Sequence, residues 1–380
     1  MDLNVALLSD RYGGDSGIGQ HTSGLYNALS KLGLKIDVYS NVVQPEVIPK
    51  HVLVHRVGLS HKGEVFACFS SDFHMLLKGI TRADILHTMA GFGWITTRTA
   101  KSLVPLVNTV HGRVRWTPHS SSMRAKLGGI VIRSLEERNL FSSRAVIAVS
   151  EHVRDYLAQQ YGLVNKVKIV SNGIDENDFM RFVETSDHIP PNRNCILLSV
   201  TRLSKERKPW RLLFLTKELL KYLPNVQLVV IGKGPLLPLL SDMRESMHLG
   251  NHVLLLGSVN HNELPRYYSA CSLYVATPTA GITVLEASAA GKAFVYFEDN
   301  LLLPSISCLE SFSGGFAASD ETDMARLVTK LLSDESRLRM LGRENQQHVR
   351  RKYLWSFLAR QILDLYSVCL DQQYGLVRLD

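Results

Sequence analysis

The sequence lacks a long hydrophobic run. No apolar stretch in its 380 residues approaches the roughly 20 residues that a helix needs to cross a bilayer. The first residues, MDLNVALLSD, contain no basic segment and carry acids on both sides of a short apolar run. They predict a first β-strand rather than a secretion signal. We expect a cytoplasmic protein, either free or peripheral at the inner membrane face.

Cysteine is scarce and scattered. The five cysteines form no CxxC pair and no metal-ligand spacing, which predicts a reduced protein without disulfides. Acidic and basic residues are both common, and the formal net charge is +8. A surplus of this size suits anionic small ligands, acidic lipid surfaces or nucleic acid and does not choose among them.

What the sequence does contain is a repeated alternation of short apolar runs and longer amphipathic segments. The runs LNVALL, KIDVYS, DILHTM, PLVNTV and AVIAVS predict strands in the first half, and CILLSVT, VQLVVIG, HVLLLG, SLYVAT and AFVYFE do so in the second. The segments between them have helical leucine periods. This predicts two doubly wound α/β domains with parallel sheets. The break SDHIPPNRN, with two prolines, is the expected linker.

A glycine cluster, YGGDSGIG, follows the first predicted strand. Its glycines would let the backbone approach a ligand closely, and a helix beginning near Gln20 would point free N–H groups at negative charge. A flexible strand-to-helix turn explains the cluster equally well.

Three observations argue against a nicotinamide dehydrogenase. Ser9 to Tyr12 separate the apolar run from the glycines, whereas the dinucleotide motif places glycines directly after the strand. The next strand, KIDVYS, ends without an acid that could bind a ribose. No tyrosine has a lysine four residues later.

Cations and glycines also follow the strands of the second half. SVTRLSKERKPW places Arg202, Lys205, Arg207 and Lys208 in one loop before a helix at Pro209. Such a loop can clamp a diphosphate, or it can be a solvated basic turn. VVIGKGP gives another glycine turn after a strand.

In TPTAGITVLEASAAGK, a helix is expected to start near Thr283. Glu286 stands three residues later, which fits a capping box. Alternatively, its carboxylate could accept the hydroxyls of a ribose while neighbouring backbone N–H groups hold phosphates.

The order of GIGQH, TVHG, VSNGIDENDF, TRLSKERK, IGKGP and AGITVLEASAAGK resembles the family 4 glycosyltransferases over nearly the whole chain. The resemblance implies a GT-B fold, with two Rossmann-like domains facing across a cleft. It implies an acceptor-side domain at 1–187, joined by a closing helix at about 354–380, and a nucleotide-sugar domain at 188–353. It also implies a retaining enzyme that transfers a hexose from a nucleoside diphosphate sugar to a hydroxyl.

The same resemblance implies roles for individual residues. Arg202 and Lys208 would clamp the diphosphate, with Arg207 as the alternative to Lys208. His111 would contact the donor sugar near the reacting centre, although a histidine capping a strand end in the core explains its position as well. Gly17 and Gly19 would lie against the donor diphosphate or the transferred sugar, and Glu286 would bind the ribose. The remaining candidates for binding the donor are Gly234, Gly281, Ile282 and Thr283.

One acid of the family pattern is missing. Family members carry a second glutamate eight positions before the one that matches Glu286, but that position is Pro278 here. This departure leaves the identity of the donor sugar open. It also leaves two alternatives, namely a non-catalytic or weakly active nucleotide-sugar-binding subunit and a GT-B-fold phosphorylase or epimerase.

We expect no cofactor and no metal, because there is no Asp-x-Asp motif and the pyrophosphate can be neutralised by cations and helix N-termini. The expected partners are a nucleotide sugar and a sugar, lipid-linked or small-molecule acceptor. The basic and aromatic stretch HGRVRWTPHSSSMRAK could meet such an acceptor at a membrane or be an ordinary solvated loop. Aromatic residues are too sparse in it for nucleic-acid binding.

Overall fold

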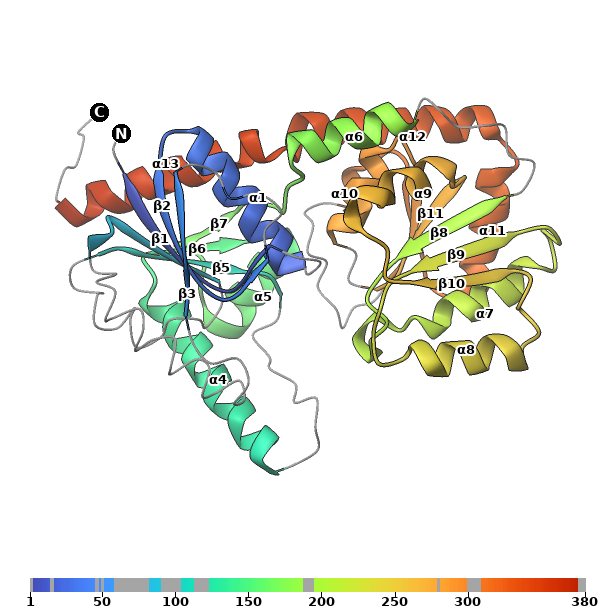
Figure 1. The fold of residues 1–380 in the computed structure, drawn as a ribbon, viewed down its shortest axis with the longest axis horizontal. Coiled ribbons are helices and arrows are strands. Elements are labelled where there is room, and N and C mark those ends of the chain that lie inside the picture. Colours follow the sequence, from blue (N-terminus) through green and yellow to red (C-terminus); the bar gives the residue numbers. More distant parts are fainter. Residues whose placement is uncertain are drawn as a thin grey trace. The chain divides into compact units, whose positions relative to one another are not determined.

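A computed structural model describes residues 3–13, 17–44, 48, 51–57, 82–89, 104–112, 123–186, 195–278, 281–298 and 309–374 (Figure 1). The chain forms two compact units. The first contains Met1–Gly173 and Trp355–Asp380, and the second contains Ile174–Leu354. The predicted linker at 186–194 lies almost wholly outside the described residues.

The first unit is built on a seven-stranded parallel sheet with the order β3-β2-β1-β4-β5-β6-β7. Its strands are β1 (Asn4–Gly13), β2 (Lys35–Gln44), β3 (Val52–Arg56), β4 (Ile85–Met89), β5 (Leu106–Val110), β6 (Ala145–Ala148) and β7 (Val167–Ile169). Its helices are α1 (Gly17–Lys31), α4 (Met123–Ser142), α5 (Glu151–Tyr161) and α13 (Trp355–Tyr374).

The second unit is built on a six-stranded parallel sheet with the order β10-β9-β8-β11-β12-β13. Its strands are β8 (Ile196–Val200), β9 (Gln227–Ile231), β10 (Val253–Gly257), β11 (Leu273–Ala276), β12 (Phe294–Phe297) and β13 (Gly315–Ala318). Its helices are α6 (Glu176–Ser186), α7 (Trp210–Leu219), α8 (Leu237–Ser246), α9 (Leu264–Ala270), α10 (Ile282–Ala289), α11 (Glu321–Leu332) and α12 (Glu335–Lys352), with short 3-10 turns η2 (Lys205–Arg207), η3 (His261–Glu263) and η4 (Leu309–Ser311).

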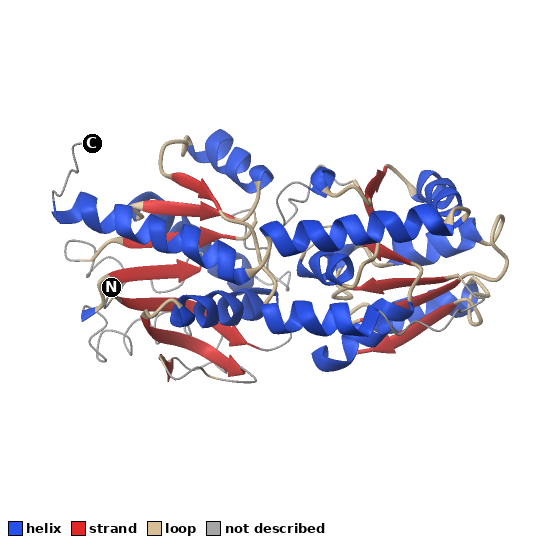
Figure 2. Cartoon of the chain, turned by 90° about the horizontal axis from the view of Figure 1, so that it is seen from above, coloured by secondary structure: helices blue, strands red, loops and turns tan. Residues whose placement is uncertain are grey.

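Alternation along each strand explains why helices cover both faces of each sheet (Figure 2). In β8, Leu197 enters one hydrophobic cluster and its neighbour Leu198 enters another. In β1, Leu7 and Leu8 divide in the same way. Successive side chains of a strand point to opposite faces, so apolar runs without polar gaps require a cover on both faces.

The predicted strands are all present, but three further strands were missed. These are β3, β7 and β13, and each lies at an edge of its sheet. Their side chains are mostly half-buried or exposed. Edge strands therefore carry less of the continuous apolar pattern from which buried strands are predicted.

Two sequence-based expectations need correction. β1 continues through Gly13, so the glycines do follow a strand directly, and the first argument against a dinucleotide site does not hold. The chain also enters the second unit at Ile174, earlier than the predicted boundary at 187/188. The reason is α6, whose Phe179 and Phe182 are buried in a core cluster of the second unit.

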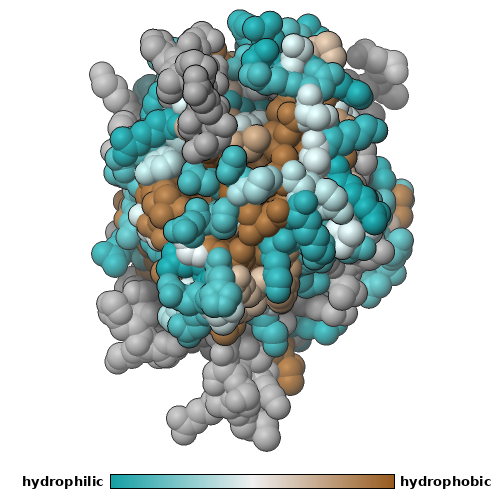
Figure 3. All heavy atoms as spheres, turned by 90° about the vertical axis from the view of Figure 1, so that its right-hand side faces the viewer, coloured by the Kyte–Doolittle hydropathy of each residue, from teal (hydrophilic) through white to brown (hydrophobic). Residues whose placement is uncertain are grey.

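No helix within the described residues is long and apolar enough to span a membrane. Figure 3 shows a face of the second unit on which apolar residues gather in the centre, with hydrophilic residues around them. Apolar exposure of this kind is ordinary, because apolar atoms contribute a large share of the accessible surface of folded proteins.

Candidate functional site

The loops that follow β8 and β11 meet at the point where the strand order of the second sheet reverses. β8 pairs with β9 on one side and with β11 on the other. Thr201 and Thr277, the residues just after β8 and β11, share a buried hydroxyl–hydroxyl hydrogen bond of 2.7 Å. Ligands of open α/β sheets bind outside the carboxyl ends of strands at such a switch point. Arg202, Lys208 and Gly281 therefore stand on loops where a ligand is expected.

The glycines of the β9 loop are required by close backbone approach. A Cβ on Gly232, which has a φ of 149°, would lie 1.8 Å from the carbonyl oxygen of Thr201. A Cβ on Gly234 would lie 2.2 Å from the carbonyl oxygen of Leu203. Gly234 thus has a packing role in joining the β8 and β9 loops, which is sufficient to explain its presence.

Arg202 is a surface cation that already has a partner. Its side chain is 64% exposed and forms an ion pair with Glu206, four residues along the loop. Its Nε also donates to Ser204 Oγ at 3.3 Å. An exposed pair of this kind is worth about 0.2–1 kcal/mol, so a diphosphate could displace Glu206 at little cost.

Arg207 and Lys208 have different surroundings. Arg207 Nη1 donates to the carbonyl oxygen of Pro278 at 3.3 Å, which ties the β8 loop to the β11 loop. Burial, followed by the nearby charge of Arg202, lowers the pKa of Arg207. Lys208 has a φ of 46°, in the left-handed region, and such non-glycine residues gather at functional sites.

The capping-box interpretation of Glu286 is wrong. Gly281 is the N-cap of α10 and makes no side-chain capping bond, and Ile282 and Thr283 form the first turn. Glu286 instead turns into the unit, where it is 2% exposed. Tyr268 donates its hydroxyl to Glu286 Oε2 at 2.7 Å and also approaches the carbonyl oxygen of Thr283 at 3.3 Å.

A histidine lies beside this carboxylate, and an acid on a further element lies on the other side of that histidine. His261 Nδ1 lies 3.8 Å from Glu286 Oε1, and His261 Nε2 lies 3.5 Å from Asp178 Oδ2 of α6. The pKa of Glu286 is raised above its usual value, chiefly by burial and also by Asp178, although His261 and the Tyr268 hydrogen bond act to lower it. The carboxylate is therefore held by its neighbours before any ligand binds.

In the first unit, His111 directly follows β5 and meets the α1 residue His21. Their rings make an edge-on contact with centroids 4.4 Å apart. His21 Nδ1 is 2.8 Å from Asn172 Oδ1, which makes Nδ1 the protonated nitrogen. Neither Nε2 has a hydrogen-bond partner among the described residues, although both atoms are buried. Two unpaired imidazole nitrogens mark this as a candidate ligand-contacting position.

Burial keeps these histidines neutral near pH 7. It lowers the pKa of His111 to about 4, and it lowers the pKa of His21 with a further contribution from the neighbouring His111. His111 can therefore donate or accept a hydrogen bond but is a poor cation at this pH.

Trp355 packs beside the histidines at the point where the chain returns to the first unit. Its ring lies 5.0 Å from that of His21. A Cβ on Gly24 or Gly173 would strike the Trp355 ring, at 2.2 and 2.8 Å respectively. The indole therefore fixes the backbones of α1 and of the segment that leaves the unit.

The glycine turn is described in part. Gly17 is the first residue of α1, so the helix begins earlier than the predicted Gln20. Gly19 is buried, and its carbonyl oxygen accepts a hydrogen bond from Thr22 Oγ1 at 2.9 Å. Residues 14–16 and 113–122, which include most of the predicted acceptor-side loop, lie outside the described residues.

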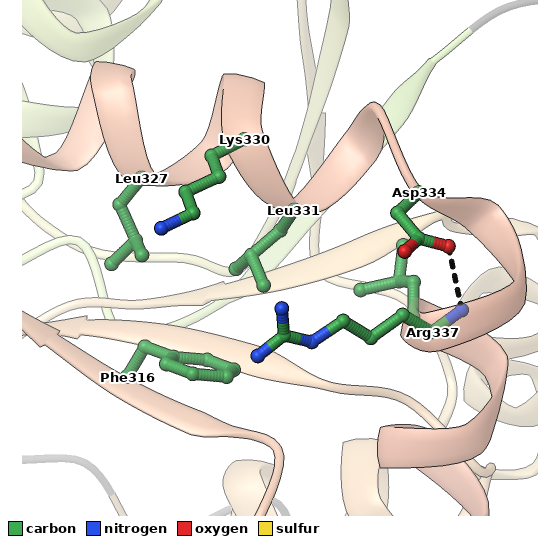
Figure 4. A pocket seen from close by; sticks show the side chains of 7 residues that line it. Phe316, Leu327, Lys330, Leu331, Asp334 and Arg337 are labelled. Atoms are coloured by element: carbon green, nitrogen blue, oxygen red, sulfur yellow. Dashed lines mark hydrogen bonds between the residues drawn. The ribbon is translucent and has the colours of Figure 1, made fainter.

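A separate cavity of about 190 Å³ lies between β13, α11 and α12 (Figure 4). It is lined by Phe316, Leu327, Leu331 and Leu338, with Lys330 and Arg337 beside them. These α11 residues belong to the last turns of a helix that runs back from its strand, so the cavity is toward the amino ends of the strands. Asp334 accepts a hydrogen bond from the Arg337 backbone N–H at 2.9 Å and so caps α12. Ligand pockets are typically about 300–1,000 Å³, and this cavity is smaller.

Sequence reasoning missed several residues of the two sites: His21, Asp178, His261, Tyr268 and Trp355. His21 lies within the quoted motif GIGQH, but its polar neighbours Gln20 and Thr22 gave no sign that its side chain is buried. The others are distant in sequence from the residues they contact, so no local pattern indicated them.

Two family models match the chain. "Glycosyltransferase Family 4" matches residues 16–178, and "Glycosyl transferases group 1" matches residues 181–348. A glycosyltransferase of Methanocaldococcus jannaschii is 23% identical over 93% of this chain and 95% of its own length. The alpha-monoglucosyldiacylglycerol synthase of Streptococcus pneumoniae is 27% identical over 56% of this chain and 51% of its own length.

Solved structures share the fold. Sucrose-phosphate synthase of Thermosynechococcus elongatus has a TM-score of 0.76 at 18% identity, covering 96% of this chain and 98% of its own. HepE of Anabaena, in complex with UDP-glucose, has a TM-score of 0.72 at 16% identity, covering 96% of this chain and all of its own. Together with the two Rossmann-like units, these findings define a GT-B protein. The chain belongs to the group 1, family 4 glycosyltransferases, and it is a glycosyltransferase.

Proposed function

We propose that this glycosyltransferase transfers a sugar from a nucleoside diphosphate sugar to an acceptor hydroxyl, with retention of configuration and without a metal. The second unit binds the nucleotide. The observation that carries the proposal is the meeting of the Arg202–Lys208 loop with the residues just after β11 at the switch point. A hydrogen bond between Thr201 and Thr277 and one from Arg207 to the Pro278 carbonyl hold the two together.

The catalytic contribution is electrostatic. As the glycosidic bond breaks, negative charge develops on the leaving phosphate. Arg202 exchanges Glu206 for a phosphate oxygen, Lys208 supplies a second cation, and the N–H groups at Gly281, Ile282 and Thr283 supply dipoles. The acceptor attacks from the face that the phosphate leaves, and the departing phosphate oxygen takes its proton.

Glu286 accepts hydrogen bonds from the ribose. An ionised carboxylate has about four lone-pair positions, and Tyr268 occupies one of them. In the first unit, Gly17, Gly19 and the neutral imidazole of His111 are the groups we propose to contact the transferred sugar. At Pro278, where the family pattern has an acid, this chain offers a backbone carbonyl that already binds Arg207. Recognition of the sugar hydroxyls then depends on other groups.

The comparisons support a uridine nucleotide and a lipid or sugar acceptor. HepE was solved with UDP-glucose, and the Streptococcus pneumoniae relative is named for a glycolipid product. We propose UDP-sugar as the first donor class to test and a lipid-linked or sugar hydroxyl as acceptor, with peripheral contact to an anionic membrane surface.

A thermal-shift panel of UDP-, GDP-, ADP- and dTDP-sugars tests this function. One base should stabilise the protein selectively, because a ligand at 100 times its Kd adds about 2.7 kcal/mol, or about 5–10 °C in Tm for a unit of this size. The donor that stabilises is then assayed for transfer. Binding without hydrolysis or transfer would favour a subunit that has lost turnover, and no stabilisation by any donor would contradict the proposal.

Chelation tests the metal-free mechanism. Adding excess EDTA to the enzyme with its selected donor should leave kcat within about twofold, because cationic side chains and N–H dipoles neutralise the leaving group. Initial rates with EDTA, and with EDTA followed by excess Mg²⁺, give the measurement. A complete loss that Mg²⁺ restores would show that a metal performs this role. NMR of the product anomer from the same reaction decides retention against inversion.

A further inference from the structure

Glu286 is connected to α6 through a line of side chains from four separate elements. Asp178 of α6, His261 of η3, Glu286 of α10 and Tyr268 of α9 follow one another at 3.5, 3.8 and 2.7 Å. α6 is the first helix after the chain enters the second unit. The line therefore ties the carboxylate to the segment that begins the unit.

The position of His261 between two carboxylates determines its chemistry. Its two ring nitrogens each face an acid, Asp178 on one side and Glu286 on the other. Only the doubly protonated ring can donate to both, because a neutral imidazole has a single N–H. The charged groups around it are Asp178 and its ion-pair partner Arg181 on α6 and Glu286 on α10. The neutral Tyr268 hydroxyl on α9 lies beyond Glu286.

Burial makes this support necessary. The Glu286 side chain is 3% exposed, and that of His261 is 20% exposed. An uncompensated buried carboxylate is costly and tends to become protonated. With only the Tyr268 hydroxyl beside it, Glu286 would have a single neutral donor. A cation beside its other oxygen would favour the ionised form and fix the direction of the carboxylate.

We propose that His261 is a positioning residue that holds the Glu286 carboxylate ionised and oriented for the ribose hydroxyls, with Asp178 holding His261 in turn. This rests on the proposed function, in which Glu286 binds ribose. His261 itself touches no substrate. Its loss should therefore weaken recognition of the ribose and leave the diphosphate contacts of the Arg202 loop unchanged.

The test compares ribose with deoxyribose. Dissociation constants for UDP, GDP and ADP and for their 2′-deoxy counterparts are measured by calorimetry on the full chain. The wild type should prefer the ribonucleotide it binds by about tenfold or more, the worth of a hydrogen bond to a charged group. In His261→Gln this preference should fall to about threefold or less, while affinity for the deoxynucleotide changes little. In transfer assays, KM for the donor should rise and kcat should stay within about threefold.

His252→Gln is the matched control. His252 also lies in the second unit, where its ring bonds the carbonyl oxygen of Val226 at 3.1 Å, and its variant should keep the wild-type preference. If His261→Gln does not fold, Asp178→Asn is measured in its place. It removes the acid that holds His261 and leaves Glu286 intact, so the preference for ribose should fall in the same way.

A preference in His261→Gln equal to that of the wild type overturns the inference, as does an equal loss of affinity for both nucleotides. If the wild type binds none of the ribonucleotides, the proposed function fails and the inference fails with it. If the wild type binds ribonucleotides but shows no preference over the deoxy forms, Glu286 does not bind the ribose 2′-hydroxyl and the inference is wrong. The proposed nucleotide site would still stand.

Discussion

Replacing Lys208 with alanine is expected to lower kcat by about 100- to 1,000-fold, the usual cost of removing one group that stabilises developing charge. Lys208 sits at the end of η2 with a φ of 46°, and its carbonyl oxygen accepts the N–H of Arg211 at 3.1 Å. The surrounding backbone thus holds it in a conformation that costs on the order of 1–3 kcal/mol. We infer that this cost is kept because it directs the ammonium group toward the leaving phosphate.

Three variants separate this role from a general effect. Lys205→Ala removes an exposed cation from the same turn and should leave kcat within about twofold. Lys208→Arg should recover only part of the rate, because a guanidinium is not a compact point charge. Lys208→Gly should raise Tm slightly, since glycine accepts a positive φ, and should still lose turnover. A wild-type kcat in Lys208→Ala would remove this residue from the mechanism.

Replacing Gly342 with alanine is expected to destabilise the second unit by roughly 3 kcal/mol or more. Gly342 lies within α12, and a Cβ there would be 1.8 Å from the carbonyl oxygen of Gly291 and 2.7 Å from its carbonyl carbon. Both are backbone atoms in a close-packed interior, so neither can move aside as a flexible side chain would. In helix propensity alone, the same change would be favourable by about 1 kcal/mol.

The measurement is the unfolding temperature, which should fall by about 6–12 °C for a loss of this size. Gly250→Ala is the control, because a Cβ there meets nothing within 4 Å and its φ is not positive. It should change Tm by less than about 2 °C. An unchanged Tm in Gly342→Ala would show that α12 can shift away from Gly291 without cost.

The neighbours of Gly342 show why its helix packs so closely. Asn345, one turn later, is fully buried, accepts the Gly314 N–H at 2.9 Å and donates to the Lys292 carbonyl oxygen at 3.1 Å. Because Gly342 has no side chain, α12 lies close enough to Gly291 for the Asn345 amide to form hydrogen bonds with the backbone of both loops. From the sequence alone, a glycine and an asparagine inside a helix only weaken the prediction of that helix.

The sequence by itself determined the two α/β units and the order of their buried strands. The apolar part of a run such as VQLVVIG, Leu228–Ile231, contains no polar residue that could face water, so its only stable place is a sheet covered on both faces. It also placed Arg202, Lys208 and Gly281 just after strands, and the carboxyl ends of parallel strands lie on one edge of a sheet. Family resemblance in the same motifs then indicated the class of enzyme.

The tertiary structure alone decided how Glu286 is used. The spacing of T-V-L-E is satisfied equally by a capping box and by a buried carboxylate, because both begin with the same helical turn. Only the packing of α9 and η3 against α10 brings Tyr268 and His261 to the carboxylate. Edge strands and the unit boundary at Ile174 were decided in the same way. Contacts between residues far apart in sequence leave no periodic signal along the chain, because each contact depends on how whole helices and strands pack in the folded protein.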